Sequence, residues 1–193
     1  RMEHAAGGEG VGNFLCWGEF PDPATGRLAF PPALILAEDP GYAVGPDAAD
    51  ESRLREFVDR SWYEYRGGAG TGLHPWRGET RLAYSGPDLP YDLLDVERAY
   101  SWLKAPRWDG RPMEVGPLAR VMALLRHEDA DARTAVDEAL ARLDLPEGAL
   151  RSTLGRTLAR AVETRLIAAA MPRFLDGLEA LALVQRLTPD VLL

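Results

Sequence analysis

The pair Gly116-Pro117 divides the chain into two parts with different residue patterns. Proline at the first position of a helix loses no hydrogen bond, because the first N–H groups of a helix have no partner within it. After this pair apolar residues recur at helical spacing, beginning with Leu118, Val121, Met122 and Leu125. Before it, glycine, proline and aromatic residues dominate and no helical period is sustained. The sequence therefore predicts a mainly α (α+β) fold, with a helical bundle half over about 116–187 and an irregular, partly β N-terminal half.

Three helices are expected in the second part. The first begins at Pro117, the second lies within 131–146 and stops before Pro146, and the third begins near Glu147. The third continues past Pro172, where a kink is expected. Its apolar stripe consists of Leu150, Leu154, Leu158, Val162, Leu166, Phe174, Leu175, Leu178 and Leu181, and a neighbouring row where another helix should approach closely consists of Gly155, Ala159 and Glu163.

Short strands are expected near the N-terminus. Residues 12–20 and 33–38 are apolar runs separated by Asp-Pro and Thr-Gly turn signals. Residues 50–65 instead favour a short helix with Asp50 or Ser52 as its N-cap. The apolar face of this helix comprises Leu54, Phe57 and Val58.

Residues 66–94 predict a long irregular loop rich in glycine and proline. A loop of this length without elements of its own is usually functional or disordered, and its tryptophan and tyrosine residues argue against disorder. We therefore expect a strand- and loop-rich part, 1–115, followed by a helical part, 116–193.

The charge of the chain excludes two classes of partner. Its 193 residues include 22 Lys and Arg against 30 Asp and Glu, which gives a formal net charge of −8 and a pI near 5.0. An acidic chain is not expected to bind nucleic acid or an anionic membrane surface. No apolar run reaches the roughly 20 residues that a membrane-spanning helix needs, so no direct membrane span is expected.

Few residues have the spacing of a known metal-binding or catalytic motif. The three histidines, His4, His74 and His127, lie far apart and form no HExxH pattern, so a histidine metal site is not expected. The single cysteine, Cys16, rules out an internal disulfide and a Cys-pair metal site, and its apolar surroundings favour a buried inert thiol. Glu114 has two interpretations: a desolvated acid with a raised pKa, or a glutamate that precedes a helix and pairs with arginine.

A long motif at 101–120, SWLKAPRWDGRPMEVGPLAR, mixes charged residues with tryptophan, proline and methionine without a clean period. Four further motifs are GVGNFLCWGEFPD at 10–22, EFVDRSWYEY at 56–65, GLHPWRGET at 72–80 and STLGRTLARAVET at 152–164. In this order and spacing, the five motifs resemble the large, catalytic subunits of nickel–iron hydrogenases. They span nearly the whole chain, which is therefore identified as a single central segment, 1–193, of such a subunit.

The resemblance implies a metal centre whose ligands this chain lacks. In such subunits nickel is held by four cysteine thiolates from two Cys-x-x-Cys motifs, and two of these thiolates bridge to an iron that carries CO and cyanide. Hydrogen is split between the metals, protons leave through the large subunit, and electrons leave through the iron–sulfur clusters of a small partner subunit. Neither Cys-x-x-Cys motif is present here, so no cofactor and no catalytic or metal-ligating residue is expected within this segment.

Related enzymes also hold a magnesium ion whose ordered waters contact an interior lysine and an interior glutamate. By the resemblance, Lys104 matches that lysine, and Glu56, with Glu64 as second choice, matches the glutamate. In the alternative interpretation, Lys104 and Arg107 simply pair with buried carboxylates. Arg60 stands where family members often have histidine, so the role of that histidine is open in this chain.

Two functions are consistent with the sequence. The first is a fragment of a hydrogenase catalytic subunit, inactive alone, whose parent enzyme oxidises or produces H2. The second is a non-enzymatic helical protein-interaction module that kept the hydrogenase scaffold. The apolar end Val191-Leu192-Leu193 leaves open a cut through a longer protein or a short tail docked on the core. Exposed apolar faces are expected to make the segment self-associate.

The compartment stays open. In this family the export signal commonly lies on the small subunit, so its absence here says little. Cytoplasmic, membrane-associated and periplasmic locations are all consistent with the resemblance.

Overall fold

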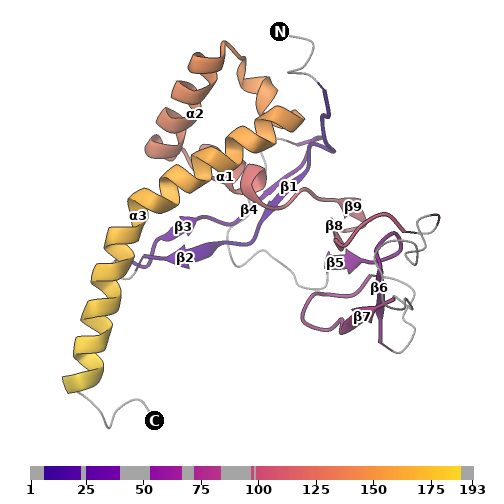
Figure 1. Cartoon of the computed structure of the whole chain (residues 1–193), viewed down its shortest axis with the longest axis horizontal. Helices are drawn as coiled ribbons and strands as arrows, with labels where there is room; N and C mark the ends of the chain where they lie inside the picture. The colour runs from indigo at the N-terminus through magenta and orange to yellow at the C-terminus, as the bar shows by residue number, and fades with distance from the viewer. Residues whose placement is uncertain are drawn as a thin grey trace, which may run out of the picture. The chain divides into compact units, whose positions relative to one another are not determined.

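The computed structural model describes residues 7–22, 25–39, 53–66, 72–83, 97 and 99–187, with side chains up to residue 179. These residues form a mixed α/β fold with three α-helices, one 3-10 helix and several small sheets (Figure 1). The chain forms two compact units: Arg1–Pro46 together with Val115–Leu193, and Asp47–Glu114. The predicted combination of helices with a partly β N-terminal half is confirmed, and the helical bundle expected over about 116–187 stays a prediction.

The first unit contains two antiparallel strand pairs. β1 (Phe14–Cys16) pairs with β4 (Ala33–Ile35), and β2 (Glu19–Pro21) pairs with β3 (Leu28–Phe30). All residues of β1 and β4 are buried. The strands predicted within 12–20 and 33–38 are confirmed, whereas β3 lies where only turn signals were predicted.

Three α-helices belong to the same unit. α1 (Pro117–Arg126) starts after Gly116, whose φ of 97° is a left-handed conformation that glycine adopts without steric cost. α2 (Ala130–Leu143) is capped by Asp129, whose side chain accepts a backbone N–H bond in the first turn. α1 contacts β1, β3 and β4, and α3 (Thr153–Leu187) contacts α1 and α2. The first two predicted helices are thus confirmed.

One apolar core joins the strands and helices of this unit. Its most deeply buried large side chains are Phe14, Phe30, Leu118, Val121, Val136 and Leu150. Burying each such side chain contributes about 1.5–3 kcal/mol. Because they come from strands near the N-terminus and from helices after residue 116, the core explains why these distant segments form one unit.

The third helix begins later than predicted. Glu147–Arg151 forms a 3-10 helix, η3, and α3 starts only at Thr153. Between them the Ser152 Oγ accepts the N–H of Gly155 at 3.0 Å and donates to the Ala149 carbonyl at 2.7 Å. A Cβ on Gly155 would lie 2.2 Å from the Ala149 oxygen, so the close approach of η3 requires glycine here. The close contact predicted at this row of α3 is confirmed.

The apolar stripe of α3 is buried only in part. Leu150 and Val162 are buried, but Leu154, Leu175 and Leu178 are 46%, 57% and 64% exposed. The predicted apolar stripe is therefore only partly buried. The row of Gly155, Ala159 and Glu163 faces α1 and η3 instead. Because this side of α3 faces inward, part of the leucine row lies in solvent.

α3 continues through Pro172 to Leu187. The kink expected at Pro172 stays a prediction, and the Leu181 side chain lies outside the described residues. Across the ranges that the structure describes, no helix combines the length and hydropathy that crossing a bilayer requires.

The described residues of the second unit form strands and turns. β5 (Leu54–Phe57) pairs with β8 (Ala105–Trp108), β8 pairs with β9 (Arg111–Pro112), and β6 (Tyr63–Tyr65) pairs with β7 (Thr80–Leu82) (Figure 1). Every one of these pairings is antiparallel.

The helix predicted within 50–65 is wrong, because β5 and β6 occupy this range. The helical spacing rested on three apolar residues, which is too short a window to separate a helix from a strand. Pairing with β8, about fifty residues further on, decides the structure. The proposed caps Asp50 and Ser52 lie outside the described residues, as do 67–71 and 84–94 of the predicted loop.

Candidate functional site

Lys104 and Glu56 form an ion pair, with the lysine Nζ 3.3 Å from the glutamate Oε2. The pairing of β5 with β8 brings them together, since Phe57 lies opposite Ala105 and Lys104 directly precedes Ala105. The two side chains are 28% and 27% exposed, so the pair is neither fully buried nor fully hydrated. An ammonium group has three N–H donors and a carboxylate has several lone pairs, so both groups keep capacity for further partners.

Backbone hydrogen bonds tie Glu56 to two other segments. Its N–H donates to the Leu73 carbonyl at 2.8 Å, and its carbonyl accepts from the Tyr65 hydroxyl. The same hydroxyl accepts the Leu73 N–H at 3.2 Å. A Cβ on Gly78 would lie 2.5 Å from the Tyr65 ring, so glycine allows the turn to approach β6. The motifs that meet here are 56–65, 72–80 and 101–120.

His74 follows Leu73 in this network and is 8% exposed. Its Nδ1 accepts the Trp76 N–H at 3.2 Å, so in the neutral ring the proton lies on Nε2. That Nε2 is buried and has no acceptor in the described part of the chain. The sequence prediction treated His74 only as a possible metal ligand, and its place in the GLHPWRGET motif was the signal for a structural role.

Glu64, the second choice of partner for Lys104, pairs with Arg81 at 2.6 Å instead. Both of these side chains are exposed. Glu114 is half-buried and lies after β9, at the end of the second unit. The structure therefore brings Lys104 to Glu56, the first choice, and leaves Glu64 in a separate surface pair.

Arg107 makes contacts of another kind. Its Nη1 donates to the Gly110 carbonyl at 3.0 Å, and its guanidinium lies over the Phe57 ring, 4.9 Å from the ring centre. No carboxylate pairs with it among the described residues. Within the described residues, Lys104 pairs with a carboxylate and Arg107 does not.

The described residues offer no donor set for a nickel–iron centre. Among them, no group of three or more His, Cys, Asp or Glu lies close enough to hold a metal ion. The only cysteine of the chain, Cys16, is buried, and its burial raises the pKa of the thiol above the ordinary value. Metals bind the thiolate, so this protonated thiol is not a prepared ligand. The predicted buried thiol is confirmed.

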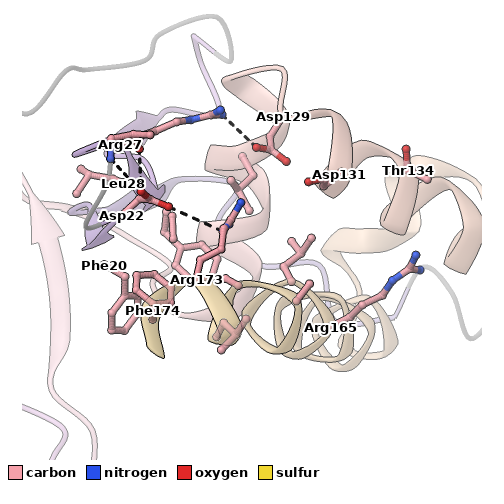
Figure 2. A pocket seen from close by; sticks show the side chains of 18 residues that line it. Phe20, Asp22, Arg27, Leu28, Asp129, Asp131, Thr134, Arg165, Arg173 and Phe174 are labelled. Atoms are coloured by element: carbon pink, nitrogen blue, oxygen red, sulfur yellow. Dashed lines mark hydrogen bonds and ion pairs between the residues drawn. The ribbon is translucent and has the colours of Figure 1, made fainter. Parts of the chain in front are cut away.

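A cavity of about 710 Å³ opens in the first unit, lined by residues of β2, β3, α2 and α3 (Figure 2). Charged residues at its edge neutralise one another, since Arg27 lies 3.2 Å from Asp129 and Arg173 lies 3.8 Å from Asp22. All of its lining residues belong to the first unit. The lysine–glutamate pair belongs to the second unit.

Comparisons with known proteins agree on one family. The family described as Nickel-dependent hydrogenase matches residues 2–187. The uptake hydrogenase large subunit of Rhodobacter capsulatus is 38% identical over 182 residues, which cover 89% of this chain and 30% of that protein. The hydrogenase-1 large chain of Escherichia coli (strain K12) is 37% identical over 173 residues, which cover 85% of this chain and 29% of that protein.

Solved structures give the same answer. The Ni-Fe-Se hydrogenase from D. vulgaris Hildenborough matches with a TM-score of 0.55 and 27% identity, covering 91% of this chain and 34% of its own. The reduced, active form of the Ni-Fe-Se hydrogenase from Desulfomicrobium baculatum matches with a TM-score of 0.55 and 27% identity over 91% of this chain and 33% of its own. The chain thus spans about 30% of the length of the curated relatives.

Proposed function

The chain belongs to the nickel-dependent hydrogenase family, and we propose that it is part of the catalytic large subunit of a nickel–iron hydrogenase. The parent reaction is the reversible oxidation of H2 to protons and electrons. The match over residues 2–187 and the identity of 37–38% to hydrogenase large subunits support this assignment.

One observation carries the proposal: the Lys104–Glu56 pair lies where three of the five resembling motifs meet. The resemblance implies that a lysine and a glutamate, matched here to Lys104 and Glu56, contact ordered waters around a magnesium ion in related enzymes. A cationic ammonium group has no lone pair for a metal, so Lys104 acts by donating hydrogen bonds to such waters. Glu56 holds the lysine in place at 3.3 Å and accepts from the same waters. We assign this orienting role to both residues, and Glu64, Arg107 and Glu114 take no part in it.

The nickel–iron centre, with CO and cyanide on its iron, takes its thiolates from segments outside this chain. The chain has one cysteine, and that thiol is buried and protonated at neutral pH. The proposal therefore makes this chain a fragment that is inactive alone. When bound, the centre supplies the splitting of H2; the residues of this chain position water and shape the protein around it.

The proposed partner of the complete subunit is a small subunit that carries iron–sulfur clusters. Within this assignment the helical part, 116–193, is the bundle-like scaffold, and the strand- and loop-rich part, 1–115, contains the lysine–glutamate pair. The core shared by α1, α2 and α3 supports the scaffold role.

A second candidate is a non-enzymatic protein-interaction module built on the same scaffold. It is favoured by the outer side of α3, where Met171, Leu175 and Leu178 are more than half exposed. Exposed apolar side chains in a row commonly mark a protein-binding surface.

The test uses the complete large subunit that contains this chain, co-expressed with its small subunit. We expect stoichiometric nickel and H2 uptake with a dye acceptor. Lys104→Met should lower activity about 10–100-fold, the usual effect of losing a group that orients metal ligands or their waters. Arg81→Gln, which removes an exposed cation of the same unit, is the matched control and should change activity less than twofold.

Two results would contradict the proposal. A complete subunit without nickel or H2 uptake would favour the interaction module. An equal loss in Lys104→Met and Arg81→Gln would overturn the role of Lys104 while leaving the family assignment intact.

A further inference from the structure

β5 pairs with β8 (Figure 1). Arg55 and Arg107 occupy directly opposite positions on these two strands. Residues that oppose each other in an antiparallel pair project from the same face, with Cβ atoms about 5 Å apart. The contact between the Arg107 guanidinium and the Phe57 ring places Phe57 on this face as well. Glu56 and Pro106, one position along each strand, project from the other face. Two like charges therefore share one face of the sheet, which is repulsive.

Neither arginine has a carboxylate partner in the part of the chain that the structure describes. The Arg55 Nη1 donates to the Gly72 carbonyl at 3.3 Å, and the Arg107 Nη1 donates to the Gly110 carbonyl at 3.0 Å. Neighbouring cations do have carboxylates; these pairs are Arg53 with Asp109 and Lys104 with Glu56. Backbone carbonyls carry no net charge, so these two hydrogen bonds do not cancel the repulsion between the two arginines.

A second observation concerns the Arg107 Nε. This atom is buried and has no hydrogen-bond acceptor among the described residues. A buried donor without an acceptor is unfavourable, because it has lost its water and gained nothing in return. Arg55 is exposed and Arg107 is half-buried, so an incoming group has access to this face. An anionic acceptor on this face would cancel the repulsion, and it would reach the buried Nε once the Arg107 side chain turns outward.

We propose that Arg55 and Arg107 form a binding site for a carboxylate. A planar carboxylate accepts two parallel N–H bonds from a guanidinium, and its charge neutralises the pair. The Phe57 ring offers an apolar surface for the methylene groups of a carboxylate-bearing side chain. Because this face is opposite to the one that carries Glu56, the site is separate from the role proposed for Lys104. The carboxylate comes from a protein side chain or from a small free acid, and two probes distinguish these sources.

The test titrates the 193-residue chain, labelled with 15N, at constant ionic strength and follows the arginine Nε–Hε resonances. The probes are acetate and N-acetyl-glutamate amide, with the uncharged N-acetyl-glutamine amide as control. We expect acetate and N-acetyl-glutamate amide to cause saturable chemical-shift changes at Arg55 and Arg107. The uncharged N-acetyl-glutamine amide should cause none. Tighter binding of the glutamate derivative assigns the site to a protein side chain, and equal binding assigns it to small acids.

Variants locate the site. Arg55→Gln and Arg107→Gln should each weaken the affinity about tenfold, the loss expected for a charge-assisted hydrogen bond. Arg77→Gln removes an exposed cation elsewhere in the unit and should leave the affinity unchanged. Arg107→Lys keeps the charge and loses the planar fork, so it should bind more weakly than wild type if the contact is bidentate. Absence of saturable shifts, or an equal loss in Arg77→Gln, would overturn the proposal.

Discussion

Arg120 of α1 and Glu163 of α3 form an ion pair at the contact between these helices, and the Glu163 side chain is only 9% exposed. The hydrogen bond with Glu163 raises the pKa of the Arg120 guanidinium, which also lies over the Phe30 ring. One charge pair thus connects α1, α3 and β3. Because the carboxylate is almost fully buried, it depends on this arginine for its stability in the fold.

Glu163→Gln should destabilise the chain by about 2 kcal/mol. Breaking a buried pair usually costs about 3–5 kcal/mol, and the partial exposure of Arg120 reduces this because water can reach the guanidinium. Urea unfolding measures the change. Glu138→Gln is the matched control, since it breaks the exposed pair with Arg165 and should have no measurable effect. Equal effects of the two variants would show that burial does not determine how much an ion pair contributes to the free energy of unfolding.

The Cys16 thiol should react slowly in the folded chain. Its burial raises the pKa, so at pH 8 both the thiolate fraction and the access of a reagent are small. Iodoacetamide labelling followed by mass spectrometry should give a rate at least tenfold slower in buffer than in 8 M urea. Rapid labelling of the native chain would mean that the strand pair β1–β4 opens easily.

Hydrogen exchange should be slower in the helices than in residues 72–83. α1 and the first half of α3 contribute buried residues to the main core, whereas 72–83 holds mostly turns and the short strand β7. Local stability follows the density of buried apolar contacts. Within α3, amides beyond Ala170 should exchange faster than those before it, because the side chains there are mostly exposed. Equal protection in 72–83 and in the helices would contradict this expectation.

The helices were predictable from sequence because their information is local. The Gly116-Pro117 start and the apolar period predicted α1, and the apolar period with a stop before Pro146 predicted α2. The strands of the second unit were not predictable, since β5 depends on a partner about fifty residues away. Length was the other difficulty: a three- or four-residue strand shows too little of any period to be recognised.

The same contrast applies to the candidate site. Lys104 and Glu56 were selected through motif resemblance, and only the register of β5 with β8 brings them to 3.3 Å. No local sequence pattern favours Glu56 over Glu64 as the partner of Lys104. The strand pairing decides it, because β5 pairs with β8 next to Lys104 whereas Glu64 on β6 pairs with Arg81. The described residues offer no acceptor to the buried Nε2 of His74, and this could not be foreseen, because hydrogen-bond satisfaction depends on packing between segments.

The chain should self-associate through the outer side of α3. Met171, Leu175 and Leu178 lie on one side of the helix and are more than half exposed. Leu175→Glu should shift the species seen by sedimentation velocity toward the monomer. Leu154→Glu introduces the same change at another exposed position of α3 and should leave the distribution unchanged. A wild-type chain that stays monomeric at high concentration would show that this surface does not mediate self-association.

The purified chain should contain no nickel–iron centre and should not oxidise H2. A site of this kind needs four thiolates, and the chain has one cysteine, whose thiol is buried and held protonated. Lys104 cannot compensate, because an ammonium group orients water around a metal that other residues hold. Metal analysis by mass spectrometry, beside an H2-uptake assay with a dye acceptor, tests this directly, and the complete large subunit with its small subunit is the positive control. Stoichiometric nickel together with turnover in the isolated chain would mean that its own residues build the centre, and the assignment of the thiolates to other segments would be wrong.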